Sequence, residues 1–304
     1  MCASPRRLIE GAILPEPEKR THMSAMDELT SILALEPIEV NLFRGLSPKE
    51  ERTRIFGGQV VAQALTAAYK TVEGRICHSL QSYFIRPGDP TLPVLYQVER
   101  SRDGHSFATR RVLAIQKGEQ IFNMACSFQV PETGFEHQSE MPEPAFSAEE
   151  MGKFVDAWIK SQPEESTRWL RNLPIEMRAI DPVDVAKPVA KPPHQMVWLR
   201  TRQDMGDDIA LNQCLLAYAS DYSLLGTAMR PHGVSWQSGV QTASLDHILW
   251  FHRPTNFSRW HLYVQDSPSA SGARGFNRGA LYREDGVLVA SAAQEGLIRW
   301  RGKK

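Results

Sequence analysis

Three residues of one short stretch, Ser244, Asp246 and His247, are of the types that form a nucleophilic triad. A serine hydroxyl becomes a nucleophile when a histidine removes its proton and a carboxylate orients that histidine. The stretch SLDHILWFHRP, which starts at Ser244, is apolar enough to predict a strand. Because successive side chains of a strand point to opposite faces, Ser244 and Asp246 share one face and His247 lies on the other. We therefore expect His247 to be a buried structural histidine, and Asp246 to be either a structural residue or a partner of Ser244.

Asp221 is a second candidate because of the apolar residues around it. Residues 209–229 carry one apolar stripe at spacings of four and three, which predicts an amphipathic helix, with Leu211, Leu215, Tyr218, Tyr222, Leu225 and Met229 on the stripe. Helical geometry places Asp221 beside that stripe. Aspartate is unfavourable inside helices, and an unpaired buried carboxylate is costly. Asp221 is therefore either a capping or surface residue at a helix break, or a hydrogen-bonded base that faces a polar pocket.

Several familiar catalytic and cofactor motifs are absent from the sequence. GHSFA at 104–108 lacks the second glycine of a GxSxG nucleophile elbow, and GARGFNRG at 272–279 has the wrong glycine spacing for a dinucleotide site. The sequence contains neither HExxH nor a P-loop, and its nine histidines do not pair with cysteines or carboxylates at metal-binding spacings. We predict no metal and no cofactor.

An internal repeat organises most of the chain. Ser79–Leu80 matches Ser244–Leu245 at an offset of 165 residues, and Tyr96 matches Tyr263 at an offset of 167. The segment EPIEVNLF at 36–43 is echoed by LPIEMRAI at 173–180. Each copy reads as a short strand, one helix and then several long strands, with the two helices predicted at 59–72 and 209–229.

Strands that follow one another as hairpins predict antiparallel pairing, with one helix laid across each sheet. The fold class is therefore α+β. We divide the chain into a flexible tail (1–26), a first unit (27–138), a linker and cover (139–172) with a helix at 149–161, and a second unit (173–304) that carries the catalytic residues.

Composition limits the classes of protein that the chain can belong to. The 35 basic residues balance the 35 acidic residues, so the general attraction to phosphate backbones that nucleic-acid binding needs is missing. No window approaches the about 20 apolar residues of a membrane span. The four cysteines are scattered, and the first residues resemble neither a signal peptide nor a transit peptide. A reducing, cytoplasmic location is expected.

Nine short motifs, in order along residues 27–300, resemble those of the acyl-CoA thioesterase II family of the TesB type. The motifs are LFRG (42–45), FGGQVVAQAL (56–65), HSLQSYFIRPGDP (78–90), DGHSF (103–107), YASD (218–221), SLDHILWFHRP (244–254), SGARGF (271–276), DGVLVAS (285–291) and AQEG (293–296). The resemblance implies a double hotdog fold, in which two tandem units each wrap an antiparallel sheet around a long helix. It also implies hydrolysis of fatty acyl-CoA to free fatty acid and CoA without a cofactor. A homo-oligomer is expected as well.

The family's catalytic trio falls on Asp221, Ser244 and Gln294 in this sequence. Ser244 stands where some family members carry threonine, and the hydroxyl group is kept. The resemblance implies that Asp221 is a general base for water, while Ser244 and Gln294 orient the water or the carboxylate. The N–H groups of residues 57–59, at the start of a predicted helix, are candidate donors to the substrate carbonyl.

One question of mechanism and two alternative functions remain open. As a thioesterase, the chain uses Asp221 either to activate water or to form an acyl anhydride with the substrate. The alternative functions are a hotdog hydratase acting on enoyl- or hydroxyacyl-CoA and a non-catalytic acyl-CoA-binding protein. A hydratase usually relies on an Asp/His pair, and the adjacent Asp246 and His247 are predicted to point apart.

The two copies differ in the residues that carry the chemistry. The sequence alignment places Ser79 opposite Ser244 and Gln129 opposite Gln294, whereas Asp221 has no carboxylate opposite it, because Gly57 and Gly58 lie there. We therefore predict one active site for each chain.

Overall fold

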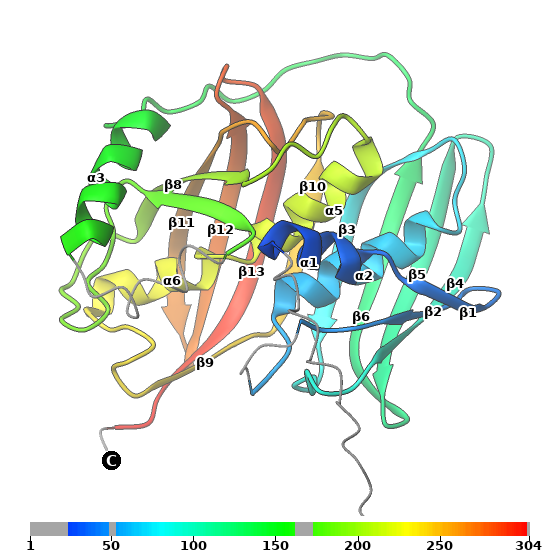
Figure 1. Ribbon diagram of the computed structural model, residues 1–304, viewed down its shortest axis with the longest axis horizontal. Helices are drawn as coiled ribbons and strands as arrows, with labels where there is room; N and C mark the ends of the chain where they lie inside the picture. Colours follow the sequence, from blue (N-terminus) through cyan, green and yellow to red (C-terminus); the bar gives the residue numbers. More distant parts are fainter. Residues whose placement is uncertain (1–23, 49–52, 162–172, 303–304) are drawn as a thin grey trace, which may run out of the picture.

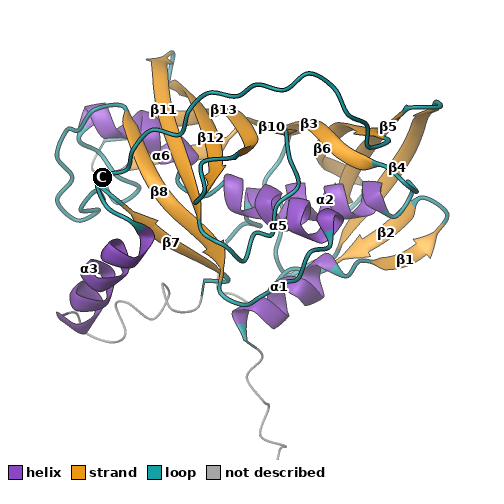
Figure 2. Cartoon of the chain, turned by 90° about the horizontal axis from the view of Figure 1, so that it is seen from above, coloured by secondary structure: helices purple, strands orange, loops and turns teal. Residues whose placement is uncertain are grey.

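The structure, a computed structural model, describes residues 24–48, 53–161 and 173–302. Helices α2 and α5 lie side by side along the same face of a strongly curved antiparallel sheet (Figures 1 and 2). The helices are α1 (Ala25–Leu33), α2 (Gly57–Tyr69), α3 (Ala148–Ser161), α5 (Ile209–Ser220), α6 (Leu224–Met229) and the short 3₁₀ helix η1 (Arg230–His232). The strands are β1 (Glu36–Glu39), β2 (Leu42–Gly45), β3 (Ile76–Phe84), β4 (Val94–Asp103), β5 (Phe107–Gln116), β6 (Glu119–Gln129), β7 (Ile175–Ala179), β8 (His194–Thr201), β9 (Val240–Ser244), β10 (Asp246–Phe251), β11 (His261–Ser271), β12 (Arg274–Arg283) and β13 (Leu288–Trp300).

The order of strands in the sheet shows the internal repeat. The order is β1-β2-β4-β5-β6-β3-β10-β13-β12-β11-β8-β7, which reads as the same series of elements from either end. β1 and β7, which hold the echoed segments found in the sequence, lie at the two edges. The two copies meet at the centre, where β3 pairs with β10 in antiparallel register and Leu80 lies opposite Leu249. The predicted α+β architecture of two tandem units follows from this arrangement.

Helices α2 and α5 run antiparallel to each other and form the centre of the core. Thr66 Oγ1 approaches Cys214 Sγ at 3.4 Å, and Gly58 near the start of α2 contacts Asp221 just after the end of α5. Small residues allow the close approach, since alanines occupy four buried positions of α2 and two of α5, namely Ala62, Ala64, Ala67, Ala68, Ala217 and Ala219. The start of one helix therefore lies against the end of the other.

The predicted helix over 209–229 is wrong at its centre. α5 ends at Ser220, Asp221 is its C-cap, and Ser223 adopts a left-handed backbone with φ of 63° before α6 begins. Two glutamines hold that turn, because Gln195 Nε2 donates to the Ser223 carbonyl and the buried Gln265 donates from Nε2 to the Ser223 hydroxyl. Because the helix breaks at this point, Asp221 lies at the end of α5 and not in the middle of one continuous helix.

The segments outside the two units are partly described. The predicted helix at 149–161 is confirmed as α3, which lies at one end of the molecule and packs Met151 against a small cluster with Trp198 and Trp260 (Figure 1). Residues 162–172 of the expected linker and most of the expected tail lie outside the described residues. α1 begins at Ala25, so the last residues of that expected tail are helical.

A buried histidine at the start of β11 predicts a pH-dependent stability. His261 is fully buried; its Nδ1–H donates to the Arg259 carbonyl at 2.8 Å, and its Nε2 lies 2.7 Å from the Thr255 hydroxyl, which donates to it. Burial lowers the pKa of His261 to about 4. Since the unfolded chain binds the proton more readily, with a pKa near 6.5, stability is complete above that pH and is lost as pH falls below it.

We expect His261 to account for about 2 kcal/mol of unfolding free energy lost between pH 7 and pH 5. Urea unfolding of the wild type and His261→Gln at both pH values measures this contribution. The variant should lose less stability on acidification than the wild type does. Equal losses in the two proteins would show that His261 is not protonated on unfolding.

Candidate active site

The carboxylate of Asp221 is the centre of a set of hydrogen bonds contributed by both copies. Gly58 N–H, from the first copy, donates to Asp221 Oδ2 at 2.9 Å. Gln294 Nε2, on β13, donates to Oδ1 at 2.7 Å, and the hydroxyl of Ser244 approaches the same oxygen at 3.4 Å. The structure therefore brings together all three residues of the predicted trio, around one carboxylate.

The ends of two helices have opposite electrostatic effects on the negative charge of this carboxylate. Asp221 follows the C-terminus of α5, whose unpaired carbonyls carry partial negative charge, and an anion is unfavourable there. The N-terminus of α2 lies on the other side and carries partial positive charge. The direct Gly58 N–H bond belongs to this positive end, so α2 stabilises the negative charge that α5 disfavours.

The glycines at the start of α2 are required by this close approach. A Cβ atom on Gly58 would lie 2.3 Å from the main-chain carbonyl oxygen of Tyr218, and one on Gly57 would lie 2.7 Å from Asp221 Oδ2. Both separations are far below van der Waals contact. Any larger residue would move α2 away from Asp221.

This contact changes the role predicted for residues 57–59. The Gly58 N–H binds Asp221, and the Gln59 N–H bonds to the Phe56 carbonyl at 3.1 Å, so neither is available to a substrate carbonyl as expected. The hydrogen bonds between described residues include none from the Gly57 N–H. Gly57 is therefore the one remaining candidate donor of the three.

The prediction that Ser244 and Asp246 share a face is wrong, and a β-bulge explains why. Ser244 pairs with Gly296 and Ile248 pairs with Ala293, so four residue steps on one side oppose three on the other. The extra residue lies between β9 and β10, and it reverses the alternation of side chains that follow it. Asp246 consequently turns away from the trio.

The two residues beside Ser244 have separate hydrogen-bond partners. Asp246 Oδ1 accepts from the main-chain N–H of Glu295 at 2.7 Å. His247 is fully buried, as expected for a structural histidine, and its partners are Ser220 and Gln294. No hydrogen bond among the described residues joins Ser244 to His247, so these residues do not form a Ser-His-Asp triad.

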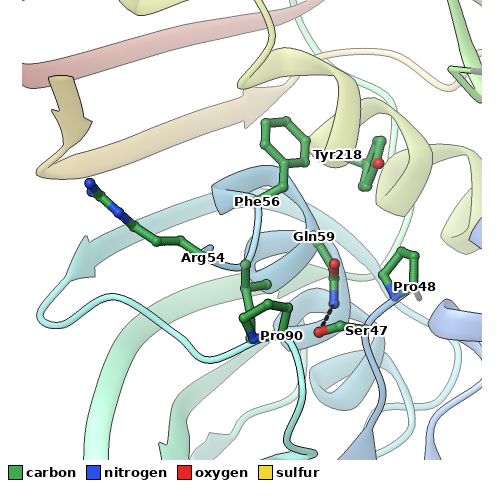
Figure 3. A pocket seen from close by; sticks show the side chains of 8 residues that line it. Ser47, Pro48, Arg54, Phe56, Gln59, Pro90 and Tyr218 are labelled. Atoms are coloured by element: carbon green, nitrogen blue, oxygen red, sulfur yellow. Dashed lines mark hydrogen bonds between the residues drawn. The ribbon is translucent and has the colours of Figure 1, made fainter. Parts of the chain in front are cut away.

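An aromatic wall lies beside the start of α2. The ring of Phe56 packs against Tyr218 with ring centres 5.1 Å apart and against Tyr222 at 4.6 Å. Figure 3 shows the side chains that line a groove beside Phe56 and Tyr218, with Arg54 extending away from the other labelled side chains. The groove is lined by Ser47, Pro48, Arg54, Ile55, Phe56, Gln59, Pro90 and Tyr218. An opening with apolar walls and a cation at its edge therefore adjoins the helix that contacts Asp221.

The described residues contain neither a metal-ligand cluster nor a helix that could cross a membrane. Across residues 24–48, 53–161 and 173–302, no three side chains of His, Cys, Asp or Glu come together as a metal site would require. Within the same ranges, no helix has both the length and the apolar character needed to cross a membrane.

Comparison with known proteins identifies the family. The profile of the acyl-CoA thioesterase family matches residues 183–297, and that of the acyl-CoA thioesterase N-terminal domain matches residues 48–129. Acyl-coenzyme A thioesterase 8 of Homo sapiens is 42% identical over 285 residues, which are 89% of this chain and 88% of the human protein. The chain belongs to the acyl-CoA thioesterase II family.

Solved structures agree with this assignment to the acyl-CoA thioesterase II family. The acyl-CoA thioesterase II TesB2 from Mycobacterium marinum is 39% identical, with a TM-score of 0.72 over 91% of this chain and 99% of that one. A hot dog fold protein from Alicyclobacillus acidocaldarius, 18% identical over 91% of this chain and 98% of its own, has a TM-score of 0.69 and shows the fold alone. The predicted double hotdog fold and the predicted enzyme class, an acyl-CoA thioester hydrolase, are confirmed. A cytoplasmic location and a homo-oligomer stay predictions.

The strand register of this thioesterase shows which first-copy residue matches Gln294. At the repeat's offset of 167 residues, Asn277 of β12 matches Arg110 of β5. Asn277 pairs with Gln294, and Arg110 pairs with Cys126. The position of Gln294 is therefore matched by Cys126, and not by Gln129 as the sequence alignment indicated.

The first-copy helix also lacks a counterpart of Asp221. α2 (Gly57–Tyr69) and its C-cap Lys70 contain no carboxylate. Gly57 and Gly58, which the sequence alignment placed opposite Asp221, face it across the helix pair and do not match it in the repeat. At the Lys70 end, the Tyr69 hydroxyl bonds to Gln213 and accepts from the Cys77 N–H. This end is filled by a protein network.

Proposed function

We propose that this thioesterase hydrolyses fatty acyl-CoA by water that Asp221 activates as a general base. The observation that carries the proposal is the carboxylate of Asp221, which receives donors from Gly58 and Gln294 at 2.9 and 2.7 Å and faces the hydroxyl of Ser244. Donors to both oxygens fix the orientation of the carboxylate. A fixed base beside an oriented water is what a thioester, already electrophilic, requires for hydrolysis.

The proposed reaction uses water as the only co-reactant. The water oxygen forms a bond to the thioester carbonyl carbon while Asp221 takes the proton, and the carbonyl oxygen becomes negative. When this intermediate collapses, the carbon–sulfur bond breaks, and the CoA sulfur receives the proton from Asp221. The products are a free fatty acid and CoA.

The groups around Asp221 support distinct parts of this reaction. The Ser244 hydroxyl lies 3.4 Å from Asp221 Oδ1. This contact is long enough for the hydroxyl to bind the water in addition to the carboxylate. Gln294 is fully buried and its Oε1 has no partner among the described residues, so that oxygen is a second acceptor for the water. We assign the Gly57 N–H, at the positive end of α2, as the donor to the developing oxyanion.

A single active site in each chain is part of the proposal. The first copy has Cys126 where the second has Gln294, and its helix α2 has no carboxylate that could match Asp221. A site without a carboxylate base does not activate water as the trio does. The first copy instead supplies Gly57 and Gly58 to the site of the second.

The two alternative functions predict different results in an activity assay. A hydratase needs a cooperating Asp/His pair, and Asp246 binds the Glu295 N–H instead of His247. The test measures free thiol released from saturated acyl-CoAs of increasing chain length, and hydration of crotonyl-CoA, with the wild type and Asp221→Ala. Thiol release that Asp221→Ala abolishes supports the proposal. Hydration without thiol release, or binding without turnover, would contradict it.

Substitutions at Ser244 separate its hydroxyl from its shape. We expect Ser244→Ala to lower kcat by about 10-fold or more, because a hydrogen bond to water or a charged group is lost. Ser244→Thr keeps the hydroxyl and should stay within about 5-fold of the wild type. Steady-state thiol release measures both. Equal kcat values for the two variants would mean that the hydroxyl is structural.

A further inference from the structure

His247 is a buried residue that the proposed reaction does not use directly. It lies on β10 with its side chain fully buried, and both ring nitrogens have partners. Nε2 lies 2.8 Å from the hydroxyl of Ser220, and Nδ1 lies 3.2 Å from Gln294 Nε2. One side of the imidazole therefore contacts the last residue of α5, and the other contacts a member of the trio.

The direction of each hydrogen bond follows from the neighbouring groups. The Ser220 hydroxyl donates to the Ala217 carbonyl at 3.0 Å, so it accepts from His247 Nε2–H. The Nδ1 of a neutral imidazole that is protonated on Nε2 is an acceptor, and it receives an N–H from Gln294. Burial lowers the pKa of His247, which keeps the ring neutral.

This arrangement uses both N–H groups of the Gln294 amide. One donates to Asp221 Oδ1 at 2.7 Å and the other to His247 Nδ1 at 3.2 Å. Rotating the amide by 180° would place Oε1 against the carboxylate oxygen and against the lone pair of Nδ1, which are both acceptors. The amide is thus held in one of its two orientations by two acceptors at once.

The main chain of His247 is fixed as well. Ser82 of β3 donates its hydroxyl to the His247 carbonyl at 2.7 Å, at the pairing of the two copies in the centre of the sheet. The imidazole is therefore positioned by β3 through its main chain and by α5 through Nε2. It is a rigid acceptor for the amide.

We propose that His247 is a positioning residue for hydrolysis: its Nδ1 holds the Gln294 amide so that Nε2–H donates to Asp221 and Oε1 stays directed at the water. This inference rests on the proposed function. Without an acceptor at residue 247, the amide loses one of its two anchors and samples the orientation that repels Asp221. The effect should fall on the chemical step, because His247 has no contact with the groove.

The test is a double-mutant cycle between residues 247 and 294, followed by thiol release. We expect His247→Leu to lower kcat by about 10-fold with KM changed by less than about 2-fold. His247→Asn, whose amide oxygen lies near the place of Nδ1, should keep more of the activity than His247→Leu. In a Gln294→Ala background, His247→Leu should cause no further loss, since the residue that it positions is gone.

Controls separate this role from a structural one. His252→Leu makes the same change at a histidine that bonds to Ser291 outside the site, and it should keep wild-type kcat. If His247→Leu does not fold, the cycle is measured with His247→Asn. Losses that multiply in the double variant, or a His247→Leu enzyme with wild-type kcat, would overturn the inference. A Gln294→Ala enzyme with wild-type kcat would instead contradict the proposed function itself.

Discussion

Replacing Asp221 with asparagine should lower kcat for acyl-CoA hydrolysis by about 10² to 10⁴-fold. Asparagine keeps the size of the side chain but cannot take a proton from water. Its amide would also present an N–H to Gly58 or to Gln294, which are both donors. The fold should remain, because the residue is a C-cap and not part of the apolar core.

Thiol release under saturating substrate and thermal unfolding together measure this effect. Asp266→Asn is a matched control, since Asp266 is a half-exposed residue of β11 that bonds to Arg278. The control should keep wild-type kcat. An Asp221→Asn enzyme that turns over at the wild-type rate would exclude Asp221 as the base.

Gln294→Ala should lower kcat by about an order of magnitude or more. The substitution removes the donor at 2.7 Å from Asp221 Oδ1 and the buried oxygen assigned to the water. Gln129 provides a comparison of the same residue type in the other copy. It ends β6 and bonds to Glu132 near the surface, so Gln129→Ala should leave kcat unchanged.

The same comparison tests whether each chain has one site. Cys126 occupies the place that matches Gln294, so Cys126→Ala should also leave kcat unchanged while it changes stability. The three variants are compared by thiol release, with circular dichroism to verify folding. Folded Gln129→Ala or Cys126→Ala enzymes as impaired as Gln294→Ala would show that both copies share the chemistry.

The repeat allowed most of the fold to be predicted from the sequence. Matching segments such as 36–43 and 173–180 became the two edge strands of a sheet whose order reads alike from both ends. The apolar stripe at 209–229 correctly placed a helix after residue 208. The stripe continues through Ser223 without interruption, so the periodicity could not indicate a turn that Gln195 and Gln265 stabilise from distant strands.

The trio itself was predicted from the motifs, but its geometry was not. A single extra residue near Leu245 reversed which side chains face the site, and no sequence pattern marks a bulge in an apolar strand. The bond from Gly58 to Asp221 joins residues 163 positions apart. The adjacent glycines at 57 and 58 did signal a close backbone approach, though its partner is a carboxylate of the enzyme and not the substrate.

The most direct test of Asp221-activated water is a single turnover in ¹⁸O-labelled water, with enzyme in excess over a saturated acyl-CoA. Mass spectrometry then locates the label in the fatty acid and in the peptide that contains Asp221. Direct attack by water predicts one ¹⁸O atom in the fatty acid and none in the carboxylate of Asp221. Label in the Asp221 carboxylate would show that an acyl anhydride forms on that residue, and would contradict its role as a general base.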